Sequence, residues 1–321
     1  AQSCRMLVLL AVWACLIPLA LSQPGGDDAS KYFSTPALLG EVATMNKVSI
    51  ASGSLSVLGS ALVLLTPALW PSMWHGKVCM QVICMISACD VMSAGFVAFG
   101  FPTTHEWCFM QGAFIFFFSR AAWMWSALCL YTLYRIVVFG QVPLSMKQMH
   151  LMVWPVNIVL ELLPFTTRTW YGTAWYLLGK GLCNLDTTNK YYYIWAGILF
   201  VGPLFMATVL LLFLSGKLWL RIRHMNAGYQ KALVRSVVLY PLVTLLACLP
   251  LLFVFIWNSG YHHNASPEYD TTGAYLFEYG LVGYVFAWNS LQGFFNTLVF
   301  FANSGESRER WAWIIRKCWR K

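Results

Sequence analysis

The stretch that decides the fold covers residues 191–216 and reads YYYIWAGILFVGPLFMATVLLLFLSG. It contains no charged side chain, and it is longer than the about 20 apolar residues that a helix needs to cross a hydrocarbon core about 30 Å thick. Only 10% of the 321 residues are charged, whereas soluble domains carry roughly a quarter. The stretch therefore predicts a membrane-spanning helix and not the core of a soluble domain.

Six other stretches share this near absence of charge. They cover residues 48–69, 78–100, 107–134, 151–167, 236–261 and 279–305. All but 151–167 clear the length of a span, and 151–167 lies at the lower limit of about 17 residues. We therefore expect an all-α membrane protein, with a bundle of seven transmembrane helices over residues 47–305.

The opening residues predict a signal peptide over residues 1–22. Arg5 precedes an apolar run that ends in Ala20-Leu21-Ser22, a small-x-small pattern typical of signal-peptidase sites. Cleavage there leaves residues 23–46 as a short extracellular tail. An additional membrane helix is the alternative interpretation, but the run is short for a span and contains Pro18.

The net charge of +9 is unevenly distributed around the expected spans. Most of the 21 Lys and Arg residues fall in segments that lie inside if the N-terminus lies outside. This positive-inside bias predicts a multi-pass plasma-membrane protein with an extracellular N-terminus and a cytoplasmic C-terminus. It also explains the net charge without nucleic-acid binding.

Residues 306–321 predict a short amphipathic helix on the inner membrane surface. Trp311, Ile314 and Ile315 share one helical face with Cys318, and basic residues lie between them, as in helices that lie on membrane lipids. Cys318 is a candidate for palmitoylation, and an unmodified cytosolic thiol is the alternative.

Two cysteines, Cys108 and Cys183, lie on the extracellular side of the expected bundle. Because thiols in that compartment are readily oxidised, we predict a disulfide between them; two free thiols are the alternative. Asn264 begins the only glycosylation sequon after the signal peptide, so it is the candidate glycosylation site.

The sequence does not predict an enzyme, a metal site or a cofactor. The six histidines lie in or beside loops, whereas an intramembrane hydrolase needs several of them at a common depth. A rhodopsin needs a Schiff-base lysine in its last span, and residues 279–305 contain none.

Several short motifs fall on the expected spans in a fixed order. They are Asp90, Cys108 to Gly112, Trp154-Pro155, Tyr240-Pro241-Leu242 and the run from Ser290 to Asn296 with its Gln-Gly-Phe-Phe. Together they resemble the G-protein-coupled receptors of the cyclic-AMP-receptor-like group and, more distantly, the secretin and adhesion receptors.

This resemblance implies a receptor that binds an unknown small extracellular ligand within the bundle and a heterotrimeric G protein inside. It assigns Asn296 and Pro241 to an activation switch; helix packing is the alternative for Asn296. The implied G-protein contacts are Arg135, Arg221, Arg223, Lys231 and Arg235. The alternative is that these basic residues only orient the chain in the membrane. Other readings of the chain are a transporter or channel that uses the charged residues within the spans, and a scaffold that no longer couples.

Arg120 is the only basic residue within an expected span, at a depth similar to that of Asp90 and Glu161. A charge there costs about 2.5 to 3.5 kcal/mol, so it should face the bundle and find a partner. Arg120 either neutralises one or both carboxylates or forms, with them, the floor of the ligand pocket. In the second case an arginine fork favours a carboxylate or phosphate ligand.

Overall fold

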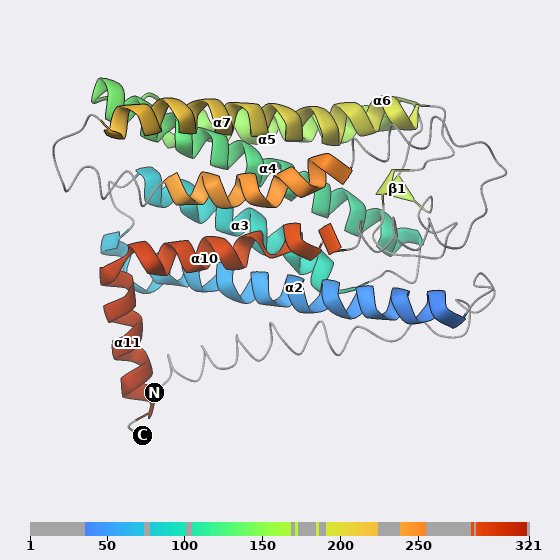
Figure 1. The fold of residues 1–321 in the computed structure, drawn as a ribbon, viewed down its shortest axis with the longest axis horizontal. Coiled ribbons are helices and arrows are strands. Elements are labelled where there is room, and N and C mark those ends of the chain that lie inside the picture. The colour runs from blue at the N-terminus through green and yellow to red at the C-terminus, as the bar shows by residue number, and fades with distance from the viewer. Residues whose placement is uncertain are drawn as a thin grey trace.

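The computed structural model describes residues 36–73, 78–100, 105–167, 171–172, 184–185, 191–223, 238–254, 284–285 and 287–319. Long helices run side by side, and a shorter helix leaves one end of the bundle (Figure 1). We call this the α11 end and the opposite one the β1 end. The predicted signal peptide lies outside the described residues, as do Cys183, Lys231, Arg235 and Asn264.

The first three long helices are α2 (Pro36–Leu69), α3 (Val78–Ala98) and α4 (His105–Phe139). α2 begins within the segment expected to be an extracellular tail, and its membrane-compatible part is Thr44–Leu69. After α3 the chain turns at Gly100, whose φ of +75° suits a residue without a side chain. Gln111 of α4 donates to the Gly100 carbonyl at 2.7 Å and to the Phe96 carbonyl at 2.9 Å, which fastens α4 to the end of α3.

The fourth apolar stretch forms a longer helix than its composition indicates. α5 spans Met146–Leu162 and continues as η3 (Leu163–Thr167). Ser145 caps its first turn, and Gln148 bonds back to the Ser145 amide at 2.8 Å. This reciprocal capping box starts the helix ahead of the apolar residues. The resulting segment, Met146–Thr167, is 22 residues long and sufficient for a span.

The fifth stretch is helical throughout but changes its winding. α6 (Tyr192–Ala196) leads into the π-helical turn η4 (Gly197–Val201), and α7 (Gly202–Arg223) follows. An apolar helix, Val238–Val254, forms part of the sixth stretch. The seventh contributes α10 (Gln292–Asn303), and α11 (Gly305–Trp319) confirms the predicted C-terminal helix.

Five helices among the described residues are long and apolar enough to cross a membrane. The sixth and seventh predicted spans are only partly described, so the number seven stays a prediction. The described chain also includes a two-residue pairing of β1 (Tyr171–Gly172) with β2 (Asn184–Leu185), which are antiparallel and lie between η3 and α6. This small departure from an all-α fold falls in a predicted extracellular loop.

α4 lies at the centre of the bundle and contacts α3, α5 and α7. Its fully buried Trp125 packs with Ile86 of α3 and Val153 of α5. By contrast, large apolar side chains such as Leu151 on α5 and Phe213 on α7 are exposed. An apolar exterior around a well-packed interior suits a bundle surrounded by lipid.

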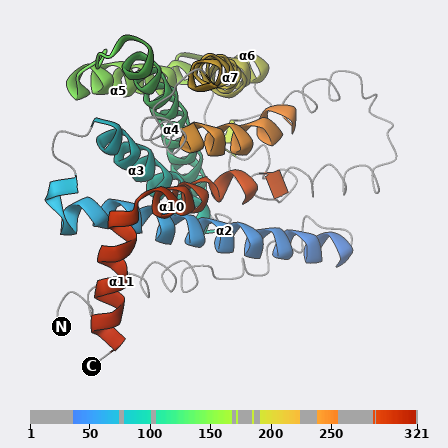
Figure 2. The ribbon, with the colours of Figure 1, turned by 60° about the vertical axis from the view of Figure 1, so that its left-hand side comes forward.

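α11 turns away from α10 across the direction of the bundle, as Figures 1 and 2 both show. Trp311 fixes it there, because its Nε1 donates to Thr66 Oγ1 of α2 at 2.9 Å and its ring meets that of Trp70 edge-on. Arg308 donates to the carbonyls of Phe301 and Ala302 at 3.1 and 2.7 Å, which satisfies the end of α10.

Candidate functional site

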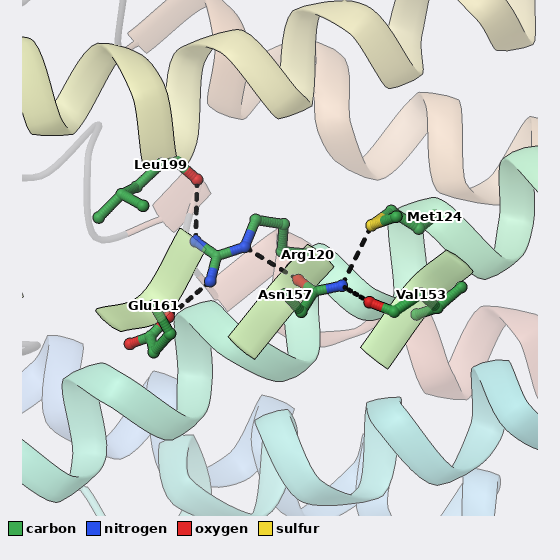
Figure 3. Close-up of polar contacts among 6 residues, drawn as sticks. All are labelled: Arg120, Met124, Val153, Asn157, Glu161 and Leu199. Atoms are coloured by element: carbon green, nitrogen blue, oxygen red, sulfur yellow. Dashed lines mark hydrogen bonds and ion pairs between the residues drawn. The ribbon is translucent and has the colours of Figure 1, made fainter. Parts of the chain in front are cut away.

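Arg120 stands on α4 at the centre of a buried polar cluster (Figure 3). Its residue is 1% exposed, and each of its three nitrogens donates a hydrogen bond. Nη2 donates to Glu161 Oε2 at 2.5 Å, Nε to Asn157 Oδ1 at 3.0 Å and Nη1 to the Leu199 carbonyl at 3.2 Å. Through these three hydrogen bonds, the guanidinium of Arg120 joins α4 to α5 and η4. We call Arg120, Asn157, Glu161 and Leu199 the Arg120 cluster.

α5 contributes both side chains that accept from Arg120. Asn157 and Glu161 are four residues apart, so they lie on one face of the helix. Asn157 is fully buried, and its Nδ2 donates to the Val153 carbonyl at 2.9 Å and meets Met124 Sδ at 3.1 Å. These contacts engage the amide nitrogen and turn the amide oxygen toward Arg120.

The third acceptor, the Leu199 carbonyl, is available to Arg120 because of a proline four residues later. In an α-helix the Leu199 carbonyl would accept from the amide of residue 203, but Pro203 has no N–H. The chain is wound as a π-helix at this point, and Gly202 donates to Gly197 across the wider turn. Arg120 Nη1 supplies a donor to Leu199. The Gly202-Pro203 pair is therefore the sequence signal for this contact.

The structure confirms that Arg120 finds a carboxylate and corrects the idea that it bridges two. Glu161 is its ion-pair partner. Asp90 instead accepts from Asn296 Nδ2 at 2.9 Å. Since Arg120 faces α5 and η4 while Asp90 of α3 meets α10, the two charged groups belong to separate sites. The expectation of a shared depth does not specify which helices face each other.

Asp90 and Asn296 define a second buried centre, the Asp90 cluster, where α2, α3 and α10 meet. Gly293, one turn before Asn296, allows the close approach: a Cβ there would meet the hydroxyls of Ser56 and Ser60 and lie 3.0 Å from Asp90 Cβ. Ion pairs in the described part of the chain join Arg120 to Glu161 and Arg310 to Glu306, so no described cation pairs with Asp90.

Several polar atoms of this region are buried without a hydrogen-bond partner among the described residues. They are the hydroxyls of Ser56, Ser60 and Ser87 and the amide oxygen of Asn296. A buried polar atom that makes no hydrogen bond costs roughly 1 to 3 kcal/mol. The packing around Asp90 therefore leaves several polar atoms without hydrogen bonds among the described residues.

A short polar chain continues from this centre into neighbouring helices. Gln292 lies one turn before Asn296 and donates to Thr244 Oγ1 at 3.5 Å, and Thr244 bonds to Ser126 of α4 at 2.9 Å. Sequence reasoning included Gln292 only as part of the Gln-Gly-Phe-Phe motif, and it missed Ser126 and Thr244 because single Ser and Thr side chains are common within spans. Pro241, the predicted switch residue, lies in the same helix as Thr244 and is buried.

The described G-protein contact candidates lie toward the α11 end of the bundle. Arg221 and Arg223 are exposed in the last turn of α7. Arg135 of α4 places its guanidinium 4.4 Å from the Phe139 ring centre. Cys108 is buried near the start of α4, and its predicted bond to Cys183 stays a prediction. Cys318 falls within α11, but its side chain is not among those described.

No metal site emerges from the described residues, which contain no group of three His, Cys, Asp or Glu side chains able to hold an ion. The two clusters are polar contacts between helices. The Arg120 cluster links α4 with α5 and η4. The Asp90 cluster hydrogen-bonds α3 to α10, and α2 packs closely against Gly293 beside it. Such contacts can hold helices together or, by exchanging partners, let them move.

Comparison with known proteins gives two similarities. The chain is 25% identical over 171 residues to G-protein coupled receptor 1 of Arabidopsis thaliana, which covers 51% of each protein. It is 27% identical over 197 residues to G-protein coupled receptor 157 of Homo sapiens, which covers 59% of this chain and 53% of the human protein. The chain resembles G-protein-coupled receptors.

These similarities support a receptor of the G-protein-coupled type and a membrane location. The chain spans about half the length of the curated relatives it matches. No protein-family model matches it. These similarities do not distinguish the cyclic-AMP-receptor-like group from other G-protein-coupled receptors, so assignment to that group stays a prediction.

Proposed function

We propose that the chain is a seven-helix receptor that transmits an extracellular ligand signal to a heterotrimeric G protein. The similarity to two G-protein-coupled receptors carries the proposal. The buried polar contacts between helices support it, because a bundle that changes its packing needs contacts that can exchange. Within the G-protein-coupled receptors, the sequence motifs most resemble the cyclic-AMP-receptor-like group.

In the proposed mechanism, the Arg120 cluster keeps α4, α5 and η4 together. Among the described residues, one hydrogen bond joins α10 to α3 and another joins the helix Val238–Val254 to α4. The Asp90 cluster and the polar chain through Thr244 are therefore the parts that change. Ligand outside and G protein inside then favour the same alternative packing. Asn296 is the switch residue in this scheme, and Pro241 lies in one of the moving helices.

The contacts of Arg120 favour a positioning role over direct ligand binding. Each of its three nitrogens already has an acceptor and the residue is 1% exposed, so a ligand would have to enter a buried site to reach the remaining N–H groups. The variant Arg120→Gln separates the roles. A positioning role predicts loss of folded protein, with recovery when Glu161→Gln is added. A ligand role predicts normal folding with weakened agonist affinity.

Reconstitution tests the function itself. The full chain in nanodiscs should accelerate guanine-nucleotide exchange on at least one class of heterotrimeric G protein when a chemically broad library is screened. Solute flux through liposomes in the absence of a G protein, without nucleotide exchange, would instead establish the transporter or channel. Neither activity from a folded preparation would favour a scaffold that does not couple.

The proposed G-protein surface is tested by neutral substitutions at Arg221, Arg223, Lys231 and Arg235. We expect these changes to weaken nucleotide exchange and leave surface expression intact. Arg316→Gln on exposed α11 is the matched control, since it removes one basic charge away from α7. Because basic residues also orient the chain, topology is verified by protease protection. Unchanged exchange with unchanged topology would refute the contact role.

A further inference from the structure

Pro250 leaves one carbonyl of the helix Val238–Val254 without its main-chain donor. In an α-helix the Leu246 carbonyl would accept from the amide of residue 250, but proline has no N–H. Trp288, which lies just before α10, supplies a donor instead: its Nε1 donates to the Leu246 carbonyl at 3.2 Å. This contact joins the sixth and seventh predicted spans and belongs to neither polar cluster.

The same arrangement also occurs at Pro203. The carbonyl four residues before that proline belongs to Leu199, and it accepts from Arg120. The two donors differ in charge and burial, because Arg120 is charged and 1% exposed whereas Trp288 is neutral and 43% exposed. Hydrogen bonds from charged donors are roughly twice as strong as neutral ones. The contact of Trp288 is therefore the more easily broken of the two.

The contact lies on the outer surface of the bundle, halfway along the helix. Leu246 is eight residues from either end of Val238–Val254, which places it about 12 Å from both ends. Leu246 is 53% exposed, so this surface faces lipid if the helix spans the membrane. Hydrocarbon contains no water that could replace a lost donor. Among the described residues, the freed carbonyl thus depends on Trp288.

The chain around Trp288 holds its indole in position. Its ring centre lies 5.2 Å from that of Phe295. The Leu291 amide donates to the Trp288 carbonyl, three residues back, at 3.1 Å, which forms a tight turn directly before α10. Gln292 and Asn296 follow at intervals of four residues and also donate to other helices, but they are buried. Trp288 is therefore the exposed member of a row of three donors.

We propose that Trp288 is a positioning residue that limits bending of the helix Val238–Val254 at Pro250. Proline loosens a helix at the preceding turn, because one hydrogen bond is missing and the ring crowds the carbonyl. While the indole holds the Leu246 carbonyl, the helix keeps its angle to the segment before α10. When the contact breaks, the part before Pro250 bends more freely. This inference concerns the bundle alone and needs no G protein, so it and the proposed receptor function can fail separately.

Hydrogen exchange of the full chain in nanodiscs, without a G protein, tests the proposal. Trp288→Phe keeps an aromatic ring beside Phe295 and removes the N–H donor. We expect the amides of Val238–Val254 to exchange about two- to ten-fold faster, which is the increase in opening that the loss of one hydrogen bond allows. Because Trp288 is partly exposed, its replacement does not open the core.

Pro250→Ala provides the matched rescue. Alanine restores the main-chain donor to the Leu246 carbonyl, so its addition to Trp288→Phe should return exchange to the wild-type rate or below. Trp219→Phe, which replaces an indole of similar exposure on α7, is the control and should leave this helix unchanged.

Two results would overturn the proposal. One is unchanged exchange of Val238–Val254 in Trp288→Phe, and the other is an acceleration that persists when Pro250→Ala is added. If Trp288→Phe alone does not fold, Pro250→Ala is compared with the double variant. Equal exchange of those two supports the proposal, and faster exchange in the double variant contradicts it.

Discussion

The Arg120 and Asp90 clusters each place one buried ionisable side chain at the helix contacts, but the two side chains have different partners. Arg120 has a counterion, an amide and a backbone carbonyl, one for each nitrogen. Asp90 has one amide partner, and unpartnered hydroxyls lie beside it. A buried charge with several partners fixes its helices, whereas a partly satisfied region loses little when its packing changes. In the proposed mechanism, the Arg120 cluster therefore belongs to the part of the bundle that stays together and the Asp90 cluster to the part that rearranges.

Arg120→Gln should have the largest effect on stability. It leaves Glu161, whose side chain is 13% exposed, without its cation, and the cost of breaking a fully buried ion pair, about 3 to 5 kcal/mol, is the upper end of the expected loss. The midpoint of thermal unfolding in nanodiscs measures the loss. Arg310→Gln is the matched comparison, because it breaks the exposed pair with Glu306 and should cost less than about 1 kcal/mol. Equal stability of the two variants would show that the Arg120–Glu161 pair stabilises the bundle no more than an exposed ion pair does.

Asn157→Leu should have the next largest effect. The change removes the acceptor of Arg120 Nε while keeping an apolar side chain of similar size, and a hydrogen bond to a charged group contributes about 1.5 to 3 kcal/mol. Val156→Ala, at an exposed neighbouring position, should be nearly neutral. If thermal unfolding shows the same small loss for both, Asn157 does not stabilise the Arg120 cluster.

Gly293→Ala tests how closely the helices approach each other around Asp90. Its Cβ meets Ser56, Ser60 and Asp90, so overpacking should cost about 1 to 3 kcal/mol and separate α10 from α2. Gly216→Ala on α7, where a Cβ meets nothing within 4 Å, is the control. Thermal unfolding of both variants measures the difference. A tolerated Gly293→Ala would show that the helices approach less closely than described.

Asp90→Asn should have the smallest effect on stability, less than about 1.5 kcal/mol in either direction. Asparagine keeps an oxygen that accepts from Asn296, and no described cation loses a partner. Its main effect should fall on nucleotide exchange by the G protein. A loss of stability as large as that of Arg120→Gln would mean that Asp90 holds the bundle, contrary to the proposed mechanism.

The sequence predicts the positions of the helices better than their partners. The charge-free run 78–100 locates α3 closely, because hydrocarbon excludes charge wherever the chain crosses it. The run 191–216 covers α6, η4 and most of α7, but α7 continues seven residues further, to Arg223. Charge-free runs place the start of α5 too late, since Ser145 and Gln148 begin the helix by capping and not by hydrophobicity. They also miss the helical start of α2 at Pro36.

For the two polar clusters, the sequence predicts the charged residues but not their partners. Arg120, Asp90 and Glu161 stand out because charges are rare within spans. Their pairing depends on which helices face each other, and composition contains no such information. Asn157 could have been found from its four-residue spacing to Glu161, and Leu199 from the missing amide of Pro203. The hydroxyls beside Asp90 have no comparable signal, because serine is tolerated on any face of a membrane helix.

Hydrogen exchange of the reconstituted full chain, with and without a nucleotide-free heterotrimeric G protein, tests the central claim most directly. The account predicts faster or slower exchange in α10 and in the part of α3 around Asp90. It also predicts no change in α5 between Asn157 and Glu161. An unchanged α10 together with altered exchange in α5, or no change anywhere with every class of G protein, would contradict it.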